Sequence, residues 1–293
     1  MDKARQIAIL GMTVSGLLAI LKLSVGWLAH SAALKADGFE SAADVFTSGL
    51  VFIALVLAAR PPDDNHPYGH GRVEILAGLL LGFLLLCAGA AISWHGLTGG
   101  ADEDRVPEFY AIWPLVISIS VKCGMVGVKN RHSRHIGSSS LLADAANDGI
   151  DIVSGLVALG ALLLTLLDPA RFLRADHYGA FAVGVIVVAM AFRVMYESGM
   201  QLMDTMPDDH AMSRIREVAL SVADVSGVEK CFARKTGLKY HVDLHLEVDP
   251  EMTVRASHEV ATRVRDRIRH QLPWVADVLV HVEPSSGWSA APN

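Results

Sequence analysis

The amino-acid sequence predicts an α-helical membrane protein in which a bundle of six transmembrane helices is followed by a small C-terminal α+β domain. Hydrophobic residues make up 52% of the 293 residues and fall in long uninterrupted runs, which soluble proteins of this length rarely have. From Pro207 onward, charged residues become frequent and runs of membrane length stop. We therefore expect a transmembrane domain over residues 1–206, a second domain over residues 207–284 and a disordered tail over residues 285–293.

Six segments of the transmembrane part each hold about the 20 apolar residues that a helix needs to cross the hydrocarbon core of a bilayer. The fourth segment contains Pro114 and Gly124, which predict local irregularities in its helix. In chain order, the segments cover residues 7–28, 32–59, 73–97, 109–128, 141–167 and 178–202.

Lys and Arg residues are unevenly distributed among the connections between these segments, and this bias predicts the orientation of the helices. Most of them lie at the N-terminus, around the loop between the second and third segments, and in the loop between the fourth and fifth. They are Lys3, Arg5, Arg60, Arg72, Lys129, Arg131 and Arg134. Arg171 and Arg174, between the fifth and sixth segments, argue the other way. The balance predicts a protein integral to the inner (plasma) membrane with both termini in the cytoplasm.

The C-terminal part combines helical and strand patterns. Apolar residues recur with helical spacing over residues 212–222 and 254–271. Residues 228–234, 240–248 and 278–283 read as strands, and the second of these alternates polar and apolar residues as a half-buried strand does. The order αββαβ predicts a two-layer, ferredoxin-like α+β domain.

Charge and cysteine content argue against several classes of protein. The formal net charge is −6 at pH 7, so no nucleic-acid partner is expected. Cys87, Cys123 and Cys231 are scattered and odd in number, which indicates packed or free thiols and no disulfide framework.

Two polar stretches of the same pattern lie within membrane-length segments. Residues 36–44 and residues 143–151 both read Ala-Asp-x-x-[Glu/Asn]-x-x-x-Asp. The spacing of four places the last two polar side chains of each stretch on one helix face. A carboxylate at the bilayer centre costs roughly 2.5–3.5 kcal/mol, so such groups are expected to face the bundle interior and bind something. The pattern predicts an oxygen-only site for a divalent cation, made of Glu40, Asp44, Asn147 and Asp151.

The same polar residues have simpler explanations. They could hydrogen-bond helices to one another without binding a metal. Asp37 and Asp144 recur one turn earlier in the two stretches, where they could cap the helix starts or form an outer vestibule on the ion path.

A second group of metal-ligand residues lies in the loop between the second and third segments. Asp63, His66 and His70 fall within eight residues, and the Gly and Pro residues beside them permit tight turns around one ion. The alternative is a polar loop whose histidines cap the next helix.

A third group lies in the C-terminal domain. His245 is on one predicted strand, and His281 and Glu283 share a face of another because they are two residues apart. His258 lies on the second predicted helix. These residues predict regulatory metal binding; the alternative is surface or strand-pairing histidines.

Together these features resemble the cation diffusion facilitators, a family of membrane metal-ion/proton antiporters. The resemblance covers residues 8–284 and rests on the two Ala-Asp stretches, the loop Asp-Asp-Asn-His-Pro-Tyr-Gly-His-Gly-Arg-Val-Glu, and the C-terminal His-Leu-Glu and His-Val-Glu-Pro segments. It implies that the membrane quartet is the transport site, that the loop and the C-terminal domain hold further metal sites, and that the chain forms a homodimer. It also implies a charge interlock between Arg72 and Asp204.

The resemblance implies that the chain exports a divalent transition metal ion from the cytoplasm in exchange for protons. Zinc members usually have His where Asn147 stands and Asp or His where Glu40 stands, and a cytoplasmic His of some zinc members is replaced by Glu229. Oxygen ligands favour Mn²⁺ or Fe²⁺ as cargo, with Zn²⁺, Co²⁺ and Cd²⁺ as further candidates.

The alternative to a transporter is a membrane metal sensor or scaffold of the same fold. We do not expect an enzyme, because the quartet offers no nucleophile and the sequence has no His-Glu-x-x-His. No cofactor is expected beyond bound Mn²⁺, Fe²⁺ or Zn²⁺. The expected partners are divalent metal ions, protons, the lipid bilayer and a second copy of the chain.

Overall fold

The computed structural model describes residues 2–99, 106–136, 139–237 and 239–285. The chain forms two compact units: one consists of residues up to 52 together with residues 80–195, and the other of residues 53–79 together with residues from 196 onward. The expected tail over residues 285–293 lies, except for Ser285, outside the described residues.

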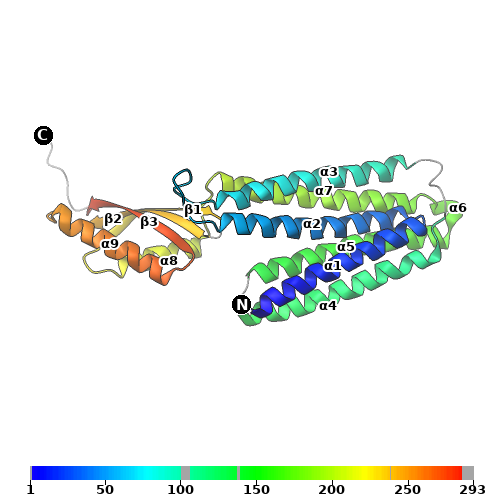
Figure 1. The fold of residues 1–293 in the computed structure, drawn as a ribbon, viewed down its shortest axis with the longest axis horizontal. Coiled ribbons are helices and arrows are strands. Elements are labelled where there is room, and N and C mark those ends of the chain that lie inside the picture. The colour runs from blue at the N-terminus through cyan, green and yellow to red at the C-terminus, as the bar shows by residue number, and fades with distance from the viewer. Residues whose placement is uncertain (1, 100–105, 137–138, 238, 286–293) are drawn as a thin grey trace. The chain divides into compact units, whose positions relative to one another are not determined.

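Six helices of the described residues are long and apolar enough to cross a membrane, as the sequence predicts (Figure 1). At most of their ends, these helices lie within a few residues of the predicted segments. The helices are α1 (Asp2–Leu28), α2 (Ala32–Ala58), α3 (Arg72–Thr98), α4 (Ile112–Ile136), α5 (Ser139–Leu167) and α7 (Ala175–Leu202).

Helix α4 is longer than the hydropathy of the sequence predicts. We expected it to end at residue 128 and its basic residues to lie in a loop, but the helix continues to Ile136 and carries Lys129 and Arg131. No Gly or Pro interrupts this stretch, and Lys and Arg are good helix formers. Pro114 lies in the first turn of α4, where a missing N–H costs no helical hydrogen bond, and Gly124 does not interrupt the helix.

The start of α2 is fixed by an aspartate on α7. Asp176 is buried; its carboxylate accepts hydrogen bonds from Ser31 Oγ at 2.8 Å and from the backbone N–H of Ala32 at 2.5 Å and of Ala33 at 3.3 Å. The two backbone donors belong to the first turn of α2, whose N–H groups have no partner within the helix, and Ser31 directly precedes that turn. Asp176 therefore caps α2 across the bundle. Helix α4 packs along α5 and against α1 (Figure 1).

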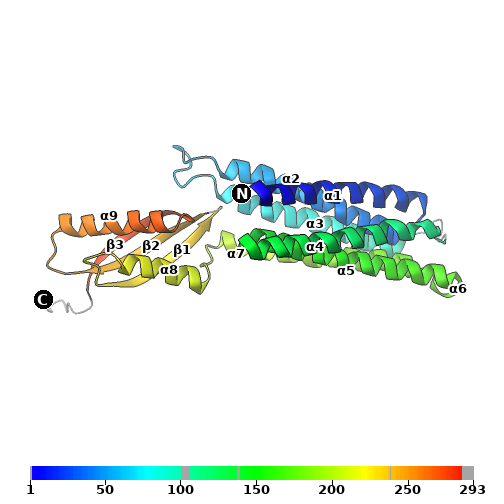
Figure 2. The same ribbon diagram turned by 90° about the horizontal axis from the view of Figure 1, so that it is seen from below.

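The C-terminal domain has the predicted order αββαβ (Figure 2). In chain order its elements are α8 (Asp209–Leu220), β1 (Gly227–Thr236), β2 (Lys239–Val248), α9 (Val254–Gln271) and β3 (Val275–Pro284). The sheet order is β1-β2-β3, with β2 antiparallel to β1 and parallel to β3.

One face of this sheet forms the core of the domain. Along β2, Val242, Leu244 and Leu246 are buried and pack with residues of α8 and α9, including Ile215 and Ile268. The intervening residues of β2 point to the other face because side chains alternate along a strand. The sheet therefore presents its polar side chains, His245 among them, on the face that the helices do not cover.

Candidate metal centres

The four polar residues of the predicted membrane site lie on two helices, with Glu40 and Asp44 on α2 and Asn147 and Asp151 on α5. Glu40 is 4% exposed and Asp151 is 6% exposed. Within the described part of the chain, both oxygens of Glu40, Oδ2 of Asp44 and Oδ1 of Asp151 are buried without a hydrogen-bond partner. Buried polar atoms are almost always paired, so this group of orphaned oxygens points to a ligand.

The three membrane carboxylates are close without converging. Glu40, Asp44 and Asp151 interact electrostatically with one another. Among the described residues, however, the three do not bring one oxygen each to within 4.8 Å of both others, as two other groups of three metal-ligand residues do. A metal bound to all three would therefore require the helices or side chains to draw together.

Buried lysines accompany these carboxylates, and their role was not predicted from the sequence. Lys22 of α1 is 1% exposed, and its Nζ lies 2.6 Å from Asp37 Oδ2 and 2.9 Å from Ser41 Oγ. Asp37 is thus held in an ion pair and is not the helix-start cap that we considered. A lysine inside an apolar run must pair or reach the interface, which is the sequence signal that could have identified Lys22.

A second cluster of buried lysines involves α4 and α5. Lys122 Nζ lies 2.8 Å from Asp148 Oδ1 and 2.5 Å from Asp151 Oδ2. Lys129 pairs with the other oxygen of Asp148. A residue of the predicted metal site is therefore in contact with a cation that belongs to the protein. Asp144, the other aspartate singled out in this stretch, has its side chain outside the described part.

The three loop residues come together. Asp63 Oδ1 lies 3.1 Å from His66 Nδ1, and Asp63 Oδ2 lies 3.4 Å from His70 Nε2. The backbone N–H groups of Asn65 and His66 donate to Asp63 Oδ1 at 3.0 and 2.7 Å. The hydrogen bond from the His66 backbone is the main cause that holds the pKa of Asp63 below its ordinary value. The loop thus presents an ionised carboxylate and two imidazoles to the same point.

The C-terminal domain brings together His245, His281 and Glu283. His245 and His281 are neighbours in the register of β2 and β3. His245 Nδ1 lies 2.5 Å and His281 Nε2 3.5 Å from Glu283 Oε1. Hydrogen bonding with Glu229, and then with His245, holds the pKa of Glu283 below its ordinary value. Their ligand atoms lie within 4.8 Å of one another, close enough to bind one ion.

His258 is not part of this group. It is exposed on α9, which covers the opposite face of the sheet. Its assignment to the C-terminal site therefore stays a prediction.

The two residues of the predicted charge interlock form an ion pair within one chain. Arg72 Nη2 lies 3.2 Å from Asp204 Oδ1, and the two side chains are 54% and 43% exposed. A pair this exposed is screened by solvent, so within one protomer it contributes little.

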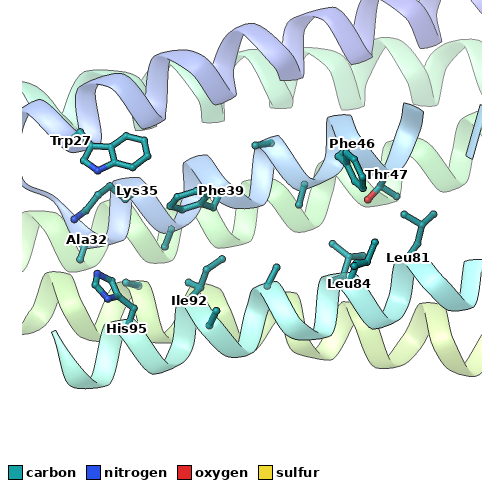
Figure 3. A pocket seen from close by; sticks show the side chains of 17 residues that line it. Trp27, Ala32, Lys35, Phe39, Phe46, Thr47, Leu81, Leu84, Ile92 and His95 are labelled. Atoms are coloured by element: carbon teal, nitrogen blue, oxygen red, sulfur yellow. The ribbon is translucent and has the colours of Figure 1, made fainter. Parts of the chain in front are cut away.

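A groove of about 820 Å³ between α2 and α3 lies away from these carboxylates (Figure 3). Trp27, Lys35 and His95 lie at one end of it, and Phe46 and Leu81 near the other (Figure 3). Its lining is almost entirely apolar, and none of the four predicted transport-site residues is among the residues that form it. The groove therefore offers no metal ligand set.

Comparison with known proteins finds two family models that match the chain. A family model described as the cation efflux transmembrane domain matches residues 8–203, and one described as the cytoplasmic domain of cation efflux proteins matches residues 207–285. Metal tolerance protein C1 of Arabidopsis thaliana is 30% identical over 97% of this chain, and the match covers 63% of the length of the plant protein. The manganese efflux system protein MneP of Bacillus subtilis is 26% identical, with 96% of each protein covered.

A solved structure, MamM-CTD 215-293, is 30% identical over 26% of this chain and 96% of its own, with a TM-score of 0.26. The magnetosome protein MamM of Magnetospirillum gryphiswaldense is 29% identical over 96% of this chain and 88% of its own length. With family models matching nearly the whole chain, the protein belongs to the cation diffusion facilitators, the family of membrane transporters that export metal cations.

Proposed function

We propose that this protein exports a divalent transition metal ion, Mn²⁺ or Fe²⁺ in the first place, from the cytoplasm in exchange for protons. One observation carries the proposal: Glu40, Asp44 and Asp151 hold buried carboxylate oxygens without hydrogen-bond partners in the described part of a six-helix membrane bundle. Such oxygens are costly in a membrane unless a cation binds them.

The donor atoms support manganese or iron over zinc. Glu40, Asp44 and Asp151 offer carboxylate oxygens, and Asn147 adds a neutral amide oxygen from the same face of α5. Hard oxygen donors suit Mn²⁺ and Fe²⁺, whereas zinc sites commonly include imidazole or thiolate. The name of the relative MneP, a manganese efflux system protein, points the same way.

Exchange with protons follows from competition for the same oxygens. A carboxylate must be deprotonated to bind a metal, so metal entry releases protons and proton entry favours metal release. Alternate opening of the bundle to the two sides of the membrane would convert this competition into antiport. The amide side chain of Asn147 does not titrate, so only the acidic residues of the site would carry protons.

The two groups outside the bundle would bind metal without carrying it. Asp63, His66 and His70 would hold an ion in the cytoplasmic loop, and His245, His281 and Glu283 would hold one in a cytoplasmic domain that forms a homodimer. Metal bound there would report the cytoplasmic concentration to the transporter. Both termini would then lie in the cytoplasm, in agreement with the distribution of Lys and Arg.

The test is metal flux into vesicles that contain the purified protein and a pH-sensitive dye. Mn²⁺, Fe²⁺, Zn²⁺, Co²⁺ and Cd²⁺ are compared, and metal uptake should be accompanied by proton release. Asp151→Asn should abolish flux, whereas Glu259→Gln, which removes an exposed carboxylate from α9, should leave it unchanged. Metal binding without flux of any of the five ions would reject transport and favour a sensor of the same fold.

A further inference from the structure

The ammonium group of Lys122 is shared between two aspartates that lie one turn apart on α5. Its Nζ is 2.5 Å from Asp151 Oδ2 and 2.8 Å from Asp148 Oδ1. Lys122 is 2% exposed, Asp148 3% and Asp151 6%. In a site this dry, an ion pair is screened far less than at the surface, so Lys122 neutralises much of the charge of Asp151.

The two aspartates differ in what remains available to a metal. Both oxygens of Asp148 contact a lysine: Oδ1 contacts Lys122 and Oδ2 contacts Lys129. Among the described residues, Asp151 contacts lysine through Oδ2 only, and its Oδ1 is buried without a hydrogen-bond partner. Asp148 is therefore suited to hold lysine, and Asp151 is the one with an oxygen left for a metal.

The ionisable side chains described in this region have a charge balance that one divalent ion would neutralise. Among the side chains that the structure describes, the buried cluster holds three ammonium groups, those of Lys22, Lys122 and Lys129. Against them stand five carboxylates, those of Asp37, Glu40, Asp44, Asp148 and Asp151. When all of these groups are ionised the set carries two excess negative charges, which a divalent cation would neutralise.

We propose that Lys122 is an internal counter-cation that the transported metal displaces from Asp151. The lysine then keeps Asp148 as its partner, so no charge is left unpaired in the membrane when the metal enters. When the metal leaves, the ammonium returns to Asp151 and competes against rebinding. Lys122 thus weakens metal binding and speeds release. This inference rests on the proposed function, because it assumes that Asp151 is a metal ligand.

The test measures Mn²⁺ affinity of the full-length chain in detergent by the electron paramagnetic resonance signal of unbound Mn²⁺. A background with His70→Ala and His245→Ala removes the loop and C-terminal sites from the titration. In this background, Lys122→Gln should bind Mn²⁺ at least about tenfold more tightly, since a buried positive charge is removed. Lys122→Arg, which keeps the charge, should bind close to the parent value.

Two further variants separate the proposal from general damage. Asp148→Asn removes the second partner of Lys122 and leaves the ammonium on Asp151, so Mn²⁺ affinity should fall. Lys129→Gln, which alters Asp148 without touching Asp151, should change affinity less than Lys122→Gln. In vesicles, Lys122→Gln should lower both KM and kcat, because tight binding slows release.

The outcomes distinguish this inference from the proposed function. If the background protein binds no Mn²⁺ and moves none of the five ions, the proposed function fails. If it binds Mn²⁺ but Lys122→Gln binds equally or more weakly, the counter-cation assignment is wrong. If Lys122→Gln does not fold, nitrogen-15 NMR of lysine ammonium groups in the unaltered chain decides. The resonance that Lys122→Arg removes must shift on saturation with Cd²⁺, and an unshifted resonance overturns the proposal.

Discussion

Removal of Asp148 should destabilise the protein more than removal of Asp151, although only Asp151 is a proposed metal ligand. In Asp151→Ala, Lys122 loses its 2.5 Å contact but keeps Asp148 at 2.8 Å. One charged hydrogen bond is lost, worth about 1.5–3 kcal/mol, and the desolvation of one carboxylate is relieved, so the net loss should be about 1–2 kcal/mol.

Asp148→Ala acts on two lysines at once. Lys122 is left with Asp151 alone, and Lys129 loses its contact with Asp148. Two charged hydrogen bonds are lost in place of one, each worth about 1.5–3 kcal/mol, so after relief of carboxylate desolvation the loss should be about 3–5 kcal/mol. The difference of roughly 2–3 kcal/mol corresponds to a Tm gap of about 5 °C, if each kcal/mol shifts Tm by about 2 °C in a chain of this size.

The two variants are compared by thermal unfolding in detergent, followed by the fluorescence of the five tryptophans. Gel filtration before heating shows whether each variant is folded, and Glu259→Ala serves as the control for loss of an exposed carboxylate. Metal flux should be absent in Asp151→Ala. If the two variants lose equal Tm, or Asp151→Ala loses more, then Asp148 does not pair with both Lys122 and Lys129, and the reasoning is wrong.

Three other predictions concern the remaining groups. His245→Ala with His281→Ala should reduce the metal bound by the full-length chain and lower flux without abolishing it; unchanged stoichiometry in calorimetry would remove these residues from a metal site. Arg72→Ala and Asp204→Ala should show a coupling of about 1 kcal/mol or less in a double-mutant cycle on unfolding, because both side chains are about half exposed; a coupling well above 2 kcal/mol would mean that a partner chain buries the pair. Asn147→His should shift flux toward Zn²⁺, since imidazole is a better zinc ligand than an amide oxygen; an active variant with the parent's Mn²⁺-to-Zn²⁺ ratio of kcat/KM would take Asn147 out of selectivity.

Much of the fold could be predicted because hydrophobic pattern decides it. Six apolar runs gave six helices, and the alternation along residues 240–248 gave a strand with one buried face. The end of α4 was mispredicted because the apolar run ends at residue 128, whereas a helix can continue through polar residues. Hydropathy marks where a helix leaves the apolar layer, not where its hydrogen bonds stop.

The candidate sites were less completely predictable. The i,i+4 spacing found Glu40 with Asp44 and Asn147 with Asp151, because that spacing is local. The partners Lys22 and Lys122 lie on other helices, and a sequence does not show which helix faces which. The cap of α2 by Asp176 could not be predicted for the same reason, because it joins residues more than 140 positions apart in the chain.

The pairing of lysines on α4 with aspartates on α5 has a consequence for how the protein enters the membrane. Helix α4 by itself would carry Lys122 within its apolar stretch, and α5 by itself would carry Asp148 and Asp151. A charge at the bilayer centre costs roughly 2.5–3.5 kcal/mol, so each helix would insert less well without the other. Only residues 137–138 separate the two helices. We therefore expect the translocation machinery to release them together as a hairpin with its charges already paired. Glycosylation mapping should show α4 inserting poorly alone and well with α5 attached, and efficient insertion of α4 by itself would contradict this order of assembly.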